Sequence, residues 1–165
     1  MGKIIVNKNK VVRLIEKIDK KKIELRQLKK DLQKAFDEIS NMWKKESALQ
    51  FPQYPPCNLG EYVGVDIILK ERVYNIYISE YKQRLCCMFC LDRKDKKNST
   101  IPLKKVMDQA DFDTLKSVVN DYLTRSGKEV WSTADGYYVL FEKEHYEDAF
   151  LFYLEIVKSF KSTCV

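Results

Sequence analysis

The stretch Glu61–Leu91, EYVGVDIILKERVYNIYISEYKQRLCCMFCL, decides the fold class of this chain. From Glu61 the pattern changes to a period of two, and three strand-like runs rich in apolar residues lie at residues 61–70, 72–80 and 84–92. A period of two is typical of β-strands that cover a core with one face. Because only short polar joints separate the runs, the sequence predicts an antiparallel meander of three strands.

A helix, a hairpin and a second helix are predicted on the C-terminal side of the meander. Apolar residues recur with helical spacing at about 108–125 and again at about 146–161. Between them, residues 129–132 and 137–143 are strand-like runs around Asp135-Gly136, a strong turn signal. The expected domain is βββ-α-ββ-α, an α+β fold with an antiparallel sheet and helices packed on one face.

Residues 1–48 carry a heptad repeat instead of the strand pattern. With Ile4 at position a, nine of the ten a and d positions from Val11 to Met42 are apolar, and only Lys21 is charged. A repeat sustained over more than four heptads predicts a coiled-coil helix that pairs with copies of itself. The predicted oligomer interface consists of Val11, Leu14, Ile18, Lys21, Leu25, Leu28, Leu32, Ala35, Ile39 and Met42.

The g positions of the repeat favour an antiparallel homodimer. They are basic at Lys10 and Lys17 and acidic at Glu24, Asp31 and Glu38. An antiparallel pair matches these basic residues with acidic ones, whereas a parallel pair gives one favourable contact and one repulsive contact. Exposed ion pairs contribute only about 0.2–1 kcal/mol each, so the charges favour this orientation without deciding it.

Residues 49–60 separate the helix from the strands and hold three prolines and a glycine. Proline ends the helix before Pro52, and the Tyr-Pro-Pro stretch favours an extended backbone. We therefore expect a coiled-coil helix for oligomerisation at 1–48, a Pro-rich linker or a strap lying on the domain at 49–60, and an α+β domain at 61–165.

The composition excludes several classes of protein. With 45% hydrophobic residues among 165, the chain is not disordered. It contains no apolar run of the roughly 20 residues that span a membrane, and polar residues follow Ile4–Val6 too soon for a signal peptide. Its five cysteines, three of them in one apolar run, do not resemble a secreted disulfide framework. We expect a cytoplasmic protein with reduced thiols and no membrane association.

No motif in the sequence points to catalysis or to a cofactor. Cys87 and Cys90 have the spacing of a metal or redox pair, but residues three apart on a strand point to opposite faces. His145 is the only histidine and lies among acidic residues, yet no nucleophile accompanies it. We therefore expect no enzyme, no catalytic residue, no metal site and no cofactor.

The basic charge of the chain is concentrated in the predicted helix. Residues 1–48 carry a net charge of +7 and residues 49–165 a net charge of −1, which gives the chain a net charge of +6. An anionic partner would be steered there, although residues 1–35 hold no aromatic side chain on which nucleobases stack. The candidate nucleic-acid or anion-binding residues are Lys20, Lys21, Lys22, Arg26, Lys29, Lys30, Arg93, Lys94, Lys96 and Lys97.

Aromatic residues in and beside the strands are candidates for a partner or ligand surface, because amphipathic aromatics are typical of binding surfaces. The alternative is that helices cover the second face of the sheet as well. The candidates are Tyr74, Tyr77, Trp131, Tyr137 and Tyr138.

The favoured function is that of a non-enzymatic interaction protein, a coiled-coil homo-oligomer whose α+β domain binds and modulates a protein or nucleoprotein partner. Small α+β proteins that carry a coiled coil and no catalytic motif are often accessory or inhibitor proteins, such as those of phages and mobile elements. This is an analogy with a class of proteins and does not rest on particular residues. Two alternatives stay open: nucleic-acid binding through the basic helix, and nucleotide or small-molecule binding by the α+β domain.

Overall fold

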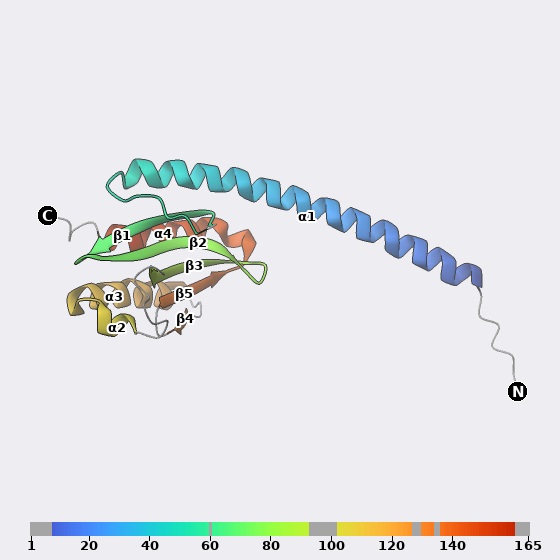
Figure 1. Cartoon of the computed structure of the whole chain (residues 1–165). Helices are drawn as coiled ribbons and strands as arrows, with labels where there is room; N and C mark the ends of the chain where they lie inside the picture. Colours follow the sequence, from blue (N-terminus) through green and yellow to red (C-terminus); the bar gives the residue numbers. More distant parts are fainter. Residues whose placement is uncertain (1–7, 60, 93–101, 127–129, 134–135, 161–165) are drawn as a thin grey trace, which may run out of the picture. The chain divides into compact units, whose positions relative to one another are not determined.

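The chain forms two compact units, Met1–Ile39 and Ser40–Val165, in the computed structural model (Figure 1). The structure describes residues 8–59, 61–92, 102–126, 130–133 and 136–160. One helix, α1 (Lys8–Gln50), begins in the first unit and ends in the second. The sequence placed the domain boundary at residue 48, whereas the last turns of α1 belong to the second unit.

The segment 51–58, here called the strap, follows α1 and lies along the free edge of the first strand. The Cys57 N–H donates to the Gly64 carbonyl at 3.0 Å, and the Asp66 N–H donates to the Pro55 carbonyl at 2.9 Å. Three side chains of the strap are buried: Phe51, Tyr54 and Cys57. The sequence left open whether this segment is a linker or a strap lying on the domain, and in the structure it lies on the domain.

The second unit contains a five-stranded antiparallel sheet in the order β1-β2-β3-β5-β4. The first three strands form the predicted meander, and the fifth strand pairs with the third. This confirms the α+β fold and the order of strands and helices. The strands are β1 (Val63–Leu69), β2 (Arg72–Tyr81), β3 (Arg84–Leu91), β4 (Val130–Thr133) and β5 (Gly136–Phe141).

Two-residue turns connect the strands of the meander. All four turn residues have positive φ: 46° at Lys70, 68° at Glu71, 49° at Lys82 and 67° at Gln83. This is the backbone of a type I′ turn, whose twist matches that of the strands it joins. The turns fix the register, so that Val65 pairs with Ile76.

Helices cover one face of the sheet, here called the core face. They are α2 (Leu103–Val106), α3 (Gln109–Ser126), the 3₁₀ turn η1 (Lys143–His145) and α4 (Tyr146–Ser159). Helix α4 contacts β2, β3 and β5, and Phe89 of β3 stacks on Phe160 with ring centroids 5.5 Å apart. Helix α3 packs beside α4, where Tyr122 contacts Phe152 with centroids 4.3 Å apart. Helix α2 is the one described α-helix that the sequence did not predict.

The last turns of α1 pack on α4 inside the second unit. Trp43 stacks on Phe150, with centroids 5.1 Å apart and planes 7° apart. The hydroxyl groups of Ser47 and Tyr153 are hydrogen-bonded at 2.8 Å, and both side chains are buried. These contacts explain why the second unit begins before the helix ends.

Candidate functional site

The a and d side chains of the heptad repeat form an exposed apolar stripe, here called the seam. The exposed fractions of its large apolar residues lie between 44% at Val11 and 67% at Met42. Ala35 and Lys21 are also exposed, and Ile39 is half-buried. The other members in this exposed range are Leu14, Ile18, Leu25, Leu28 and Leu32. Exposed apolar surface that is continuous in this way is typical of interaction sites.

The seam and the domain-facing side of α1 are different faces of the helix. Ser40, Trp43 and Ser47 are buried in the second unit, at the helical spacing of three and four residues. Met42 lies between them in sequence but is 67% exposed, and Leu49, two residues after Ser47, is 78% exposed. Packing on the domain therefore leaves the seam uncovered in the last turns of α1.

Ion pairs within the helix neutralise part of the basic cluster. The Lys21 ammonium lies 2.6 Å from a carboxylate oxygen of Glu24, and that of Lys22 lies 3.5 Å from Asp19. All four side chains are exposed. The helix carries four more members of the cluster, whereas the other four, in residues 93–97, fall outside the described residues. The helical members are Lys20, Arg26, Lys29 and Lys30.

The predicted tyrosine surface is divided between the two faces of the sheet. Tyr74 is 1% exposed on the core face, and Tyr137 shares that face and contacts Phe112 of α3. Both therefore belong to the helix-covered side, which corrects their assignment to an outward surface. Tyr77 and Tyr138 lie on the opposite face, here called the outer face, where the register places both beside Met88. For Trp131 the structure describes the backbone, which pairs with Tyr138.

Two glycines allow close packing on the outer face. A Cβ atom at Gly64 would lie 2.7 Å from the Tyr77 Cβ, and one at Gly136 would lie 3.1 Å from the Cys90 Cβ. Burial, with Cys90 alongside, raises the pKa of the Tyr77 phenol. The outer face is a packed layer of half-buried side chains rather than an open row of aromatic rings.

A buried amide joins two carboxylates at the same face. The Asn75 side chain is 1% exposed, and its nitrogen donates to Asp66 at 2.7 Å and to Asp92 at 3.0 Å. These bonds satisfy both N–H groups of a side chain that would otherwise be costly to bury. Sequence reasoning missed this cluster because its three residues lie on three different strands or strand ends.

The four described cysteines are buried thiols. Cys87 faces the core beside Ile78, whereas Cys90 faces outward beside Asn75, so the two cannot share one ion. Burial raises the pKa of Cys86 to about 12 and that of Cys57 and Cys87 still further, which makes thiolate chemistry unfavourable. Within the described ranges no group of three or more His, Cys, Asp and Glu side chains is arranged to hold a metal ion.

The acidic residues near His145 form ion pairs at the end of β5. Lys143 donates to Glu80 at 2.7 Å, and this hydrogen bond lowers the pKa of the Glu80 carboxyl. Arg84 pairs with Glu142 at 2.7 Å. His145 itself is exposed, and its Nδ1 lies 3.7 Å from Asp148. The described contacts of these groups are those of a surface ion-pair cluster.

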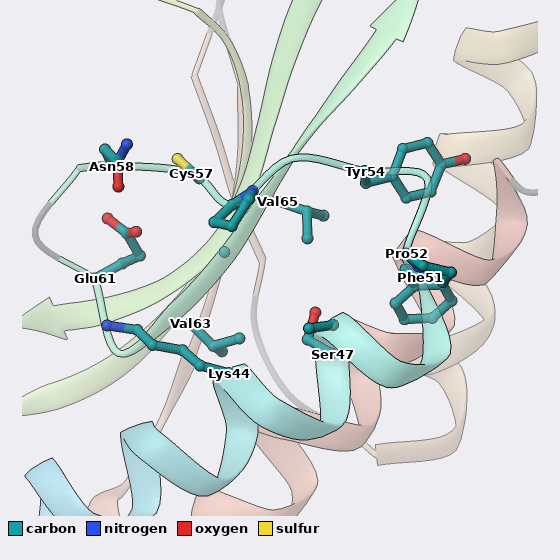
Figure 2. A pocket seen from close by; sticks show the side chains of 13 residues that line it. Lys44, Ser47, Phe51, Pro52, Tyr54, Cys57, Asn58, Glu61, Val63 and Val65 are labelled. Carbon is teal, nitrogen blue, oxygen red and sulfur yellow. The ribbon is translucent and has the colours of Figure 1, made fainter.

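A pocket of about 460 Å³ lies between the last turns of α1, the strap and β1 (Figure 2). We call it the strap pocket. Most of its lining is apolar, and the polar lining residues come from α1, from the strap and from Glu61, which precedes β1. The apolar lining residues are Ala48, Phe51, Pro52, Tyr54, Pro56, Val63, Gly64 and Val65. The polar lining residues are Lys44, Ser47, Cys57, Asn58 and Glu61.

Comparison of the chain with protein-family models gives no match. Comparisons with curated proteins and with solved structures give no significant similarity. Among the described helices, none has an apolar stretch long enough to cross a membrane. The candidate sites are therefore judged on their own geometry.

Proposed function

We propose that this chain is a non-enzymatic interaction protein that self-associates through the seam of α1 and presents its α+β domain to a partner. The observation that supports self-association is the exposure of nine of the ten seam residues, all but Ile39. At about 25 cal/mol per Å² of apolar surface removed from water, a partner helix would stabilise such a stripe.

The occupant proposed for the seam is a second copy of α1 in antiparallel orientation. Charge complementarity favours it: pairing centred on Glu24 brings Lys10 opposite Glu38 and Lys17 opposite Asp31 of the other copy. The remaining repulsion between the two Glu24 side chains is reduced because each has a Lys21 ammonium 2.6 Å away.

A pair of matched substitutions tests self-association. Leu25 lies on the seam at position a, and Ile23 lies off it at position f; they are 53% and 65% exposed. Leu25→Glu is expected to convert the dimer to a monomer in sedimentation velocity at tens of micromolar, because it places a charge in the interface. Ile23→Glu is expected to leave the dimer intact. A monomeric parent protein, or equal effects of both changes, would contradict the proposal.

Disulfide trapping tests the orientation. In a Cys164→Ser background, Glu24→Cys brings two thiols together only in the antiparallel pair. Ile18→Cys does so only in a parallel pair, because the antiparallel register places Ile18 opposite Leu28. Oxidation should therefore link the Glu24→Cys protein and not the Ile18→Cys protein on non-reducing gels. The reverse result would establish a parallel helix pair.

Nucleic-acid binding is the weaker proposal for the basic helix. Lys21 and Lys22 already face carboxylates, and neutralised cations release fewer counterions from a phosphate backbone. Binding to duplex DNA that falls steeply between about 50 and 200 mM salt would favour it, provided that changing Lys20, Lys22 and Arg26 to Glu abolishes that binding.

A further inference from the structure

The strap pocket has two chemically different ends. Figure 2 shows the Lys44 amine, the Asn58 amide and the Glu61 carboxylate on one side of the pocket. The rings of Phe51 and Tyr54 lie on the other side. A cavity with a charged end and an aromatic end is complementary to an amphipathic ligand.

The polar end has bonding capacity that the described part of the chain does not use. Within that part, Lys44 and Asn58 make no hydrogen bond or ion pair with another side chain. Glu61 accepts one hydrogen bond, from the backbone N–H of Leu59, which holds the carboxylate in place and leaves its other oxygen available. Hydrogen bonds to ionised groups are about twice as strong as neutral ones.

We propose that the strap pocket binds a small zwitterion with an apolar tail, of which a free α-amino acid with a large apolar side chain is the simplest case. The ligand carboxylate accepts hydrogen bonds from Lys44, and its ammonium group donates to Glu61. Its tail lies against Phe51 and Tyr54. The volume of about 460 Å³ falls within the range of about 300–1,000 Å³ typical of small-molecule sites.

The presence of both charges at one end favours a zwitterion over simpler ligands. An apolar carboxylate would satisfy Lys44 but bring its own negative charge towards Glu61. An apolar amine would pair with Glu61 but bring its own positive charge towards Lys44. A neutral apolar molecule would shield both charges from water without replacing their hydrogen bonds, which is costly.

Isothermal titration of the full chain with three related probes tests the proposal. L-phenylalanine has both charged groups, 3-phenylpropionate lacks the amine and 2-phenylethylamine lacks the carboxylate. We expect L-phenylalanine to bind at least about tenfold more tightly than either analogue, a difference of about 1.4 kcal/mol. Equal binding of an analogue would overturn the proposal, as would the absence of binding by L-phenylalanine, L-leucine and L-tryptophan alike.

Two variants assign the charged contacts. Lys44→Met should weaken L-phenylalanine binding about tenfold but should not weaken 2-phenylethylamine binding, because the Lys44 charge repels an amine that has no carboxylate to pair with it. Glu61→Gln keeps the acceptor for the Leu59 N–H and should weaken L-phenylalanine but not 3-phenylpropionate. The matched control is Lys45→Met, since Lys45 is the next residue and is exposed outside the pocket. If that control weakens binding as much as Lys44→Met, the pocket is not the site.

This inference does not depend on self-association. The monomeric Leu25→Glu protein should bind L-phenylalanine as the parent does, because the seam contributes no residue to the strap pocket. Loss of binding in that variant would contradict a site built wholly within the second unit.

Discussion

Four individual residues determine how the meander turns. Lys70, Glu71, Lys82 and Gln83 all adopt the left-handed backbone, although none is glycine, asparagine or aspartate. A left-handed conformation costs about 1–2 kcal/mol for an ordinary L-residue. The chain tolerates this cost because the strands on both sides are paired throughout their length.

Gln83→Gly is therefore expected to stabilise the protein by up to about 1 kcal/mol. Glycine relieves the left-handed strain but loses about 0.4–1 kcal/mol through the greater freedom of the unfolded chain. Thermal and urea unfolding would measure the change. The control is Ser79→Gly, at an extended position of β2, which should be destabilising. Equal losses in both variants would mean that the turn is not strained.

At the scale of elements, α1 has two faces with different surroundings. Its last turns use Ser40, Trp43 and Ser47 to complete the core of the second unit, and its seam stays exposed. The hydrogen bond between Ser47 and Tyr153 is the buried polar contact between this helix and α4. Sequence periodicity predicts the seam but not this second face, because the second face consists of only these three residues.

Tyr153→Phe and Ser47→Ala are each expected to destabilise the protein by about 1–3 kcal/mol, because each leaves a buried hydroxyl group unpaired. The double variant should lose much less than the sum, since no unpaired hydroxyl remains. A thermodynamic cycle from denaturant unfolding measures this coupling. Additive losses would show that the two hydroxyl groups are satisfied separately.

The elements were predictable from the sequence, but which side of each strand faces the helices was only partly predictable. The spacing of apolar residues predicts each strand and the two longer helices of the domain. It does not say how the tyrosines of β2 divide between the faces, because Tyr74 and Tyr77 lie on opposite faces and both faces of the strand carry aromatic side chains. The strap pocket was not predictable, since Lys44, Asn58 and Glu61 come together only when the helix end, the strap and β1 pack.

At the scale of the whole molecule, Lys21 is the one charged position of the seam. In the proposed antiparallel dimer, two copies of it flank the central Glu24 pair, and its ammonium already lies 2.6 Å from Glu24 in one chain. A polar residue in a coiled-coil core commonly fixes register or partner orientation at a cost in stability.

Lys21→Leu should consequently raise the melting temperature of the dimer and weaken its orientation preference. The orientation readout is the trapping assay, in which the Ile18→Cys protein should now become linked as well. A lower melting temperature would mean that Lys21 makes a contact absent from an antiparallel dimer, and the homodimer proposal would then be wrong.

The prolines of the strap bear on aggregation. An open strand edge is a template for pairing with another chain. In this protein the strap already occupies the middle of the β1 edge, through Cys57 N–H to Gly64 and Asp66 N–H to Pro55. Pro55 and Pro56 have no N–H to offer to a further strand. The same segment that lines the pocket thus blocks another chain from pairing with the middle of the β1 edge.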